Sequence, residues 1–139
     1  MVVKYTRTAH LYRQGRRAGE FPVELGWGGL VDKARQGDGA TPEGRYRVVA
    51  KKSGADTRFH LALLLDYPNT LDRQAFRLAK LEGEIRESSG IGGLIEVHGE
   101  GGQGRDWTDG CVALRNEDMQ KVFAAAYQGM PVTIVGRLP

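Results

Sequence analysis

The sequence predicts a mainly β fold with two helices, and three observations lead to that prediction. Apolar segments of strand length recur along the chain, and some of them alternate apolar with polar residues. The chain also holds 20 glycines, a content that favours many turns and loops over a helical bundle. Only two segments carry apolar residues at helical spacing.

Length and composition indicate one globular domain. The chain has 139 residues, of which 40% are apolar and 27% are charged, so we expect a single domain over residues 1–139. No apolar run is long enough to span a membrane. The N-terminal segment alternates and is charged throughout, so we expect no signal peptide in this chain.

The first elements are expected to form a β-hairpin followed by a long loop. Residues 3–12 alternate and predict a strand. Gln14-Gly15 forms a turn, and residues 17–26 are the hairpin partner. Residues 26–41 are rich in glycine and contain two aspartates, a composition typical of a loop.

The middle of the chain predicts two strands and then a helix. Residues 45–51 form a strand, and residues 59–66 form another whose apolar run indicates burial on both faces. Thr70 or Asp72 can cap a helix that runs to about residue 88. That helix carries a rough apolar face: Leu71, Ala75, Leu78, Ala79 and Ile85.

The last third predicts short strands around a loop, then a helix and a final strand. A strand over residues 94–97 precedes the loop 99–110, and residues 111–114 are extended. Asn116 caps a helix that ends before Gly129. Its core-facing stripe is Met119, Val122, Phe123, Ala126 and Tyr127. Residues 132–135 form the last strand.

The candidate chemistry lies on either side of the glycine-rich loop 99–110. Cys111 is the only cysteine, and an apolar strand delivers His98 to the other end of the loop. A thiol becomes a strong nucleophile when a base takes its proton, so Cys111 and His98 predict a Cys-His nucleophilic site. Backbone N–H groups of Gly110 and Cys111 are the candidate oxyanion hole. Arg115 is a candidate for binding a substrate carboxylate as a two-pronged donor.

Other interpretations of these residues remain open at this stage. An isolated cysteine is often a small buried apolar residue, and a lone histidine is often structural. Thr108 and Asp109 suit a turn, while Trp107 suits a lid or a substrate-facing wall. A zinc site using Cys111, His98 and His60 lacks the paired spacing that such sites show, so no metal is predicted. Basic residues are scattered, which argues against nucleic-acid binding despite the net charge of +3.

Several motifs together resemble the L,D-transpeptidase catalytic domain (YkuD-type family) of bacterial cell-wall enzymes. His98-Gly99 and the run TDGCVALRN over residues 108–116 resemble the family signature: His-Gly, a variable loop, then Ser/Thr-x-Gly-Cys and usually an arginine. GDGATPEGRY over residues 37–46 and DYPN over residues 66–69 resemble two further family segments. WTDGC over residues 107–111 indicates a sub-branch, because Asp109 stands where many members carry a second histidine.

The resemblance implies a fold, a reaction and a place of action. The fold is a β-sandwich-like domain, and no cofactor is expected. The substrate is a peptidoglycan stem peptide, with Cys111 as nucleophile, His98 as base and the Gly99 carbonyl orienting that base. Trp107, Thr108, Asp109 and Arg115 are expected around the substrate. Such an enzyme contributes to cell-wall biogenesis and cell shape from the periplasm or cell envelope, and it makes 3-3 crosslinks or releases D-Ala.

A different class of function remains possible for the same resemblance. The chain could be a non-catalytic peptidoglycan-binding module in which the change to Asp109 has removed activity. Retention of both Cys111 and His98 favours the enzyme. The sequence leaves the acyl acceptor and the oligomeric state undetermined.

Overall fold

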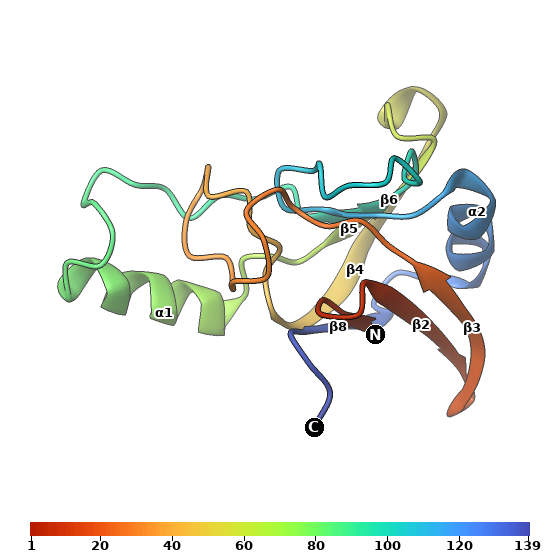
Figure 1. Cartoon of the computed structure of the whole chain (residues 1–139), viewed down its shortest axis with the longest axis horizontal. Coiled ribbons are helices and arrows are strands. Elements are labelled where there is room, and N and C mark those ends of the chain that lie inside the picture. The colour runs from red at the N-terminus through yellow and green to blue at the C-terminus, as the bar shows by residue number, and fades with distance from the viewer.

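The structure is a computed structural model that describes residues 1–139, and its main element is one eight-stranded sheet. Its strands are β1 (Val2–Val3), β2 (Thr8–Arg13), β3 (Arg16–Pro22), β4 (Gly44–Ser53), β5 (Leu61–Leu65), β6 (Glu96–His98), β7 (Val112–Ala113) and β8 (Pro131–Val135). Their order in the sheet is β3-β2-β1-β8-β4-β5-β6-β7. Two α-helices, α1 (Thr70–Leu81) and α2 (Asn116–Ala125), and one 3-10 turn, Gly54–Asp56, complete the fold (Figure 1). The predicted mainly β fold with two helices is confirmed.

Strand β4 joins the two halves of the sheet. The start of β4 pairs with β8, and its later residues pair with β5. A register shift between Val48 and Ala50 marks the change, and such irregularities bend a strand. The core lies inside the bent sheet and takes side chains from both halves, such as Phe21, Leu63 and Ile134.

Helix α2 covers part of this core as its apolar spacing predicts. It contacts β5, and Met119 and Val122 are buried among core residues. Tyr127 from the predicted stripe lies beyond the helix and is exposed, because α2 ends at Ala125.

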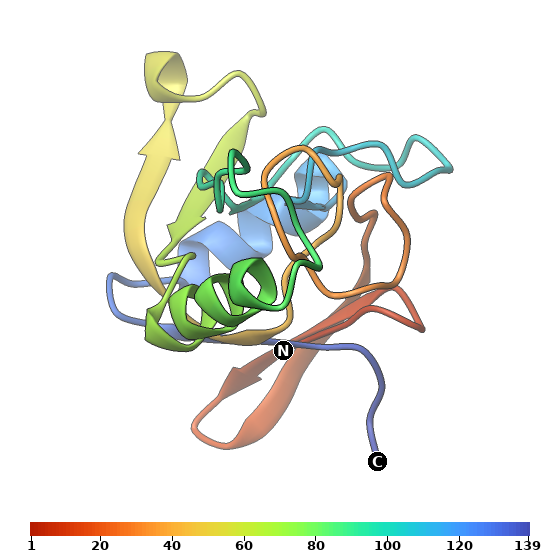
Figure 2. The ribbon, with the colours of Figure 1, turned by 90° about the vertical axis from the view of Figure 1, so that its left-hand side faces the viewer.

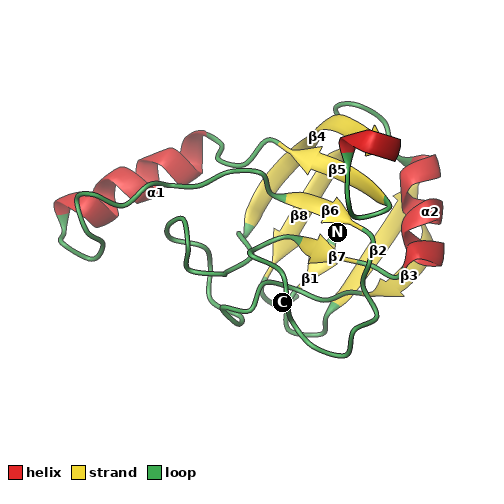
Figure 3. Ribbon diagram, turned by 90° about the horizontal axis from the view of Figure 1, so that it is seen from above, coloured by secondary structure: helices red, strands yellow, loops and turns green.

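Helix α1 differs from the expectation, because its apolar face does not pack on the core. The helix projects away from the sheet (Figure 3), and none of its residues is buried. Leu71, Leu78 and Leu81 are exposed. A capping box secures its start, in which Asn69 accepts from the Asp72 N–H and Asp72 accepts from the Asn69 N–H. The cap is therefore Asn69, and the helix ends at Leu81 instead of near residue 88.

The first predicted strand is also interrupted, and a buried lysine accompanies the break. Residues 4–7 form a turn between β1 and β2. The Lys4 side chain is fully buried, and its Nζ donates to the carbonyls of Val31 (2.7 Å) and Thr41 (2.6 Å). It also lies 3.2 Å from a carboxylate oxygen of Glu43. Lys4 thus fastens the long loop 26–43 to the sheet.

The long loop before β4 lies next to two other loops (Figure 2). The Trp27 N–H donates to the Thr108 carbonyl at 3.0 Å, and the Gln36 N–H donates to the Gly90 carbonyl at 2.8 Å. The loop before β4 therefore contacts both the loop after α1 and the loop before Cys111. None of the helices combines the length and apolar character needed to cross a lipid bilayer.

Candidate active site

A cavity of about 680 Å³ is lined by both Cys111 and His98. Parallel pairing of β6 with β7 sets His98 opposite Ala113, two residues beyond Cys111. The same cavity is lined by Trp107, Thr108 and Asp109. The loop 99–110 therefore brings together five of the predicted site residues. A second cavity, of about 540 Å³, is lined mostly by apolar side chains and contains neither Cys111 nor His98.

The His98 ring is held in place by a hydrogen bond and by stacking on another ring. Its Nδ1 lies 2.7 Å from the Gly99 carbonyl oxygen. Because that oxygen can only accept, Nδ1 carries the proton and the neutral ring keeps its lone pair on Nε2. The Phe59 ring stacks on the imidazole with centroids 4.0 Å apart. Burial lowers the pKa of His98, so the ring is neutral near pH 7 and able to accept a proton.

The Cys111 thiol is protonated in the resting state. Burial raises the pKa of Cys111 to about 11, and the negative charges of Glu96 and Asp109 act in the same direction. Its Sγ lies 3.3 Å from the Glu96 amide nitrogen, which donates to it, and 3.5 Å from the Leu94 carbonyl oxygen, which accepts from it. The resting cavity is therefore lined by both a neutral thiol and a neutral imidazole.

Thr108 and Gly110 fix the turn that presents the thiol. The Thr108 hydroxyl donates to the Cys111 carbonyl at 2.7 Å and accepts from the Gly110 N–H at 3.2 Å. Gly110 has a φ of +128°, and a Cβ on it would lie 2.8 Å from the Ala40 carbonyl oxygen, so the turn requires glycine.

The structure changes one detail of the predicted oxyanion hole. The Gly110 N–H is already bound to Thr108, whereas the Cys111 N–H donates to no backbone group. Cys111 therefore supplies the one free N–H of the predicted pair.

Comparison with known proteins identifies the family of the chain. A family model described as the L,D-transpeptidase catalytic domain (YkuD) matches residues 1–134. The chain belongs to the L,D-transpeptidase catalytic domain family. YafK of Escherichia coli strain K12 is 30% identical to it over 126 residues, which make up 88% of this chain and 44% of YafK. The chain thus spans less than half the length of this relative.

Solved structures show the same fold. The helical cell shape determining protein Pgp2 of Campylobacter jejuni matches with a TM-score of 0.74 and 25% identity, over 99% of this chain and 47% of Pgp2. Bd1075 of Bdellovibrio bacteriovorus matches with a TM-score of 0.70 and 23% identity, over 99% of this chain and 47% of that chain. L,D-transpeptidase 1 of Mycobacterium tuberculosis matches with a TM-score of 0.59 and 16% identity, over 97% of this chain and 59% of that chain.

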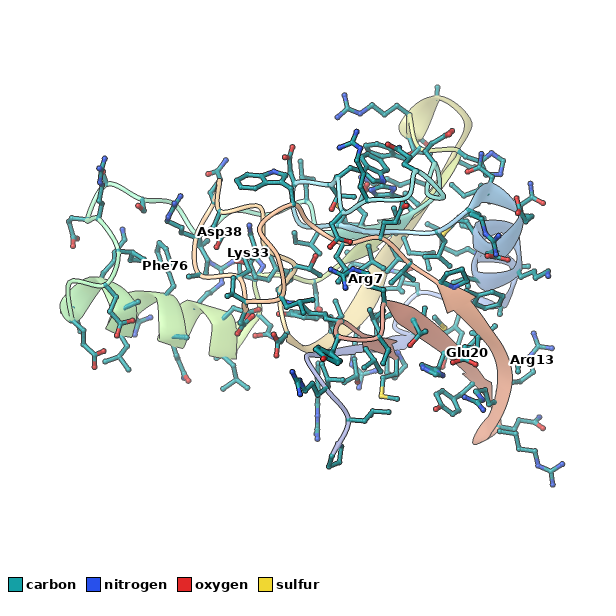
Figure 4. All side chains as sticks on the ribbon, viewed as in Figure 1. Arg7, Arg13, Glu20, Lys33, Asp38 and Phe76 are labelled. Carbon is teal, nitrogen blue, oxygen red and sulfur yellow. The ribbon has the colours of Figure 1, made fainter.

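Asp109 connects the cysteine loop to a second loop. Its carboxylate accepts from the Trp27 indole N–H at 3.0 Å. In the same long loop, Asp38 accepts from Lys33 at 2.9 Å and from the Ala40 N–H at 3.0 Å (Figure 4). The carbonyl oxygen of the same residue, Ala40, packs against Gly110. This L,D-transpeptidase domain thus supports its cysteine turn with residues far away in the sequence.

Arg115 lies outside the cavity, contrary to its expected position. Its guanidinium pairs with Asp118 at 3.2 Å, at the start of α2. The pair spans one helical turn, where a buried Asp118 holds the arginine. The structure therefore does not place Arg115 where a carboxylate in this cavity would bind.

Glu24, which no sequence motif singles out, holds the loop 99–110 in place. Its carboxylate accepts from the Gln103 N–H (3.1 Å), the Gly104 N–H (2.5 Å) and the Trp107 indole N–H (2.9 Å). The Trp107 ring in turn lies 5.8 Å from the His98 ring. A glutamate just after a β-strand carries no motif, so only the tertiary structure reveals that it organises the loop 99–110.

We expect Glu24→Gln to disorder this loop and to weaken the site more than the fold. Glutamine keeps the size of the side chain but loses the charge and one acceptor oxygen, and charged hydrogen bonds each contribute about 1.5–3 kcal/mol. Trp107 fluorescence and proteolysis within residues 100–106 should both report the loosened loop. Glu20→Gln, on the exposed β3 edge, is the matched control. Equal protease resistance of Glu24→Gln and wild type would contradict this role.

Proposed function

We propose that this domain is a cysteine-dependent acyl transferase that acts on peptidoglycan stem peptides. The observation that carries the proposal is that a neutral Cys111 thiol lines the same cavity as a His98 ring whose Nδ1 is bound to the Gly99 carbonyl. That arrangement leaves Nε2 as the base in the cavity that holds the thiol. Membership of the L,D-transpeptidase family supplies the substrate class.

The reaction proceeds in two balanced steps. His98 Nε2 takes the proton of Cys111 while Sγ forms a bond to the carbonyl carbon at the L-centre of diaminopimelate. The free Cys111 N–H donates to the developing oxyanion. The bond to the D-Ala nitrogen then breaks, and D-Ala leaves with the proton that His98 carried. In the second step, an amine of another stem or a water molecule attacks the thioester and restores the thiol.

The electrostatics of the site favour proton transfer at the moment of attack. Burial holds the pKa of Cys111 high and the pKa of His98 low, so an ion pair is not the resting form. The Glu96 N–H already donates to Sγ and stabilises the thiolate when it forms. The site thus resembles a serine-type nucleophile with its base more than a preformed thiolate.

A peptidoglycan substrate supports work in the cell envelope, which is the periplasm in a bacterium with an outer membrane. The proposed contribution is to cell-wall biogenesis and, through the wall, to cell shape. The competing function is a peptidoglycan-binding module without turnover. Both functions require the cavity to accept a stem peptide, so turnover is what separates them.

Incubation with purified disaccharide-tetrapeptide tests the proposal. We expect mass spectrometry to show a tripeptide product if water is the acceptor, or a 3-3 crosslinked dimer if a second stem is. Cys111→Ala should give neither product and should still bind the tetrapeptide. Binding by a folded wild-type protein that leaves the tetrapeptide unchanged would support the binding module instead.

A further inference from the structure

The cavity contains one cationic side chain that no group of the protein neutralises. Lys52 and Arg58 are its two basic lining residues. The Lys52 Nζ lies 2.7 Å from a Glu96 carboxylate oxygen, so this lysine is paired. The Arg58 guanidinium makes no ion pair and donates no hydrogen bond, and it lies over the face of the Phe59 ring.

Arg58 is connected to the catalytic base through stacked rings. Its Cζ lies 5.0 Å from the centroid of the Phe59 ring, and that ring stacks on His98 at 4.0 Å. The Phe59 N–H donates to the Thr57 hydroxyl at 3.0 Å, which fixes the backbone beneath the stack. The planar guanidinium therefore occupies a defined side of the cavity, because it lies over the same Phe59 ring that stacks on the imidazole.

An anionic partner lines the cavity two residues earlier. Asp56 ends the 3-10 turn before Arg58, and like Arg58 it makes no ion pair in the structure. An unpaired carboxylate and an unpaired guanidinium at one side of a cavity match a ligand that carries both an ammonium and a carboxylate group. The two residues do not satisfy each other, so both are available to such a ligand.

We propose that Arg58 binds a free carboxylate of the stem peptide, and that this carboxylate belongs to the D-centre of diaminopimelate. The inference rests on the proposed function. The D-centre is zwitterionic, so its ammonium matches Asp56 while its carboxylate matches Arg58. Arg58 thereby performs the role that the sequence analysis gave to Arg115, whose guanidinium pairs with Asp118 instead. A carboxylate on the terminal D-Ala would present the same chemistry without the ammonium.

Three substrates separate these sources: the free tetrapeptide, the tetrapeptide amidated at the D-centre of diaminopimelate, and the tetrapeptide amidated at D-Ala. We expect the wild type to have a KM about tenfold higher for the first of these amides than for the free tetrapeptide, as the loss of one partly exposed charged hydrogen bond implies. Arg58→Gln should raise KM for the free tetrapeptide about tenfold, so that its KM values for the free tetrapeptide and for the D-centre amide become equal. Arg77→Gln, on the exposed side of α1, is the matched control and should behave as wild type.

Binding provides a second readout that does not depend on turnover. In the Cys111→Ala background, Arg58→Gln should raise the Kd for the free tetrapeptide by the same factor and leave the Kd for the D-centre amide unchanged. The proposal would be overturned if Arg58→Gln still preferred the free tetrapeptide over the tetrapeptide amidated at the D-centre. If the wild type bound only the D-Ala amide more weakly than the free tetrapeptide, the assignment to the D-centre would be overturned. If the wild type releases no D-Ala and Cys111→Ala binds no tetrapeptide, the proposed function itself fails.

Discussion

Replacement of His98 by alanine should lower kcat/KM for D-Ala release about 10²- to 10⁴-fold, the usual contribution of a general base. The reason is the resting state of the thiol, because burial raises the pKa of Cys111 to about 11. Without a base in the cavity, almost no thiolate forms at neutral pH. A continuous assay of released D-Ala, with circular dichroism as the control for folding, measures this effect.

The pH dependence of the wild type checks the same assignment. Burial lowers the pKa of His98, so the base stays unprotonated at pH 7 and kcat/KM should fall only below about pH 6.5, the usual value for histidine. The unfolded chain binds this proton more readily, so the free energy of unfolding should decline as pH falls below about 6.5 and level off below the lowered pKa of the folded state. A loss of activity that begins well above pH 7 would contradict a buried neutral base.

Replacement of Lys4 by alanine should destabilise the fold by about 2–4 kcal/mol, the range expected when buried polar groups lose a charged partner. The substitution leaves the carbonyls of Val31 and Thr41 without their donor. The partly exposed Glu43 regains some hydration, which keeps the loss below that of a fully buried pair. Urea unfolding measures the change.

Lys121→Ala is the matched control for this substitution. Lys121 lies on the exposed face of α2 and makes no ion pair, so its loss should change the free energy of unfolding by less than about 0.5 kcal/mol. A Lys4→Ala variant as stable as the Lys121→Ala variant would show that the loop 26–43 does not need the lysine.

The fold was predictable where local pattern and tertiary packing agree. The spacing of Met119 and Val122 predicted a helix that packs on the core, and α2 does so. The same reasoning was wrong for α1, because periodicity shows which residues share a face but not what that face meets. Lys4 was unpredictable for a related reason: its three partners come from residues 31, 41 and 43.

The candidate site was predictable where neighbours in sequence are neighbours in space. The Gly99 carbonyl lies beside His98, and Thr108 and Asp109 share the cavity of Cys111. Glu24 and Arg58 reach the site from other strands and loops, and no short motif signals such long-range contacts. The sequence pattern also suggested Arg115 as a carboxylate-binding residue. Its spacing from Cys111 did not indicate that it pairs with Asp118.

The proposed reaction requires that Cys111 forms a thioester with the stem peptide. The most direct measurement is the mass of the protein after acid quenching during turnover of the disaccharide-tetrapeptide, followed by mapping of the modified peptide. We expect a protein species that is heavier by the mass of the substrate less D-Ala, with the added mass on Cys111, and we expect no such species in Cys111→Ala. An acyl group carried by another residue, or D-Ala release that continues in Cys111→Ala, would contradict it.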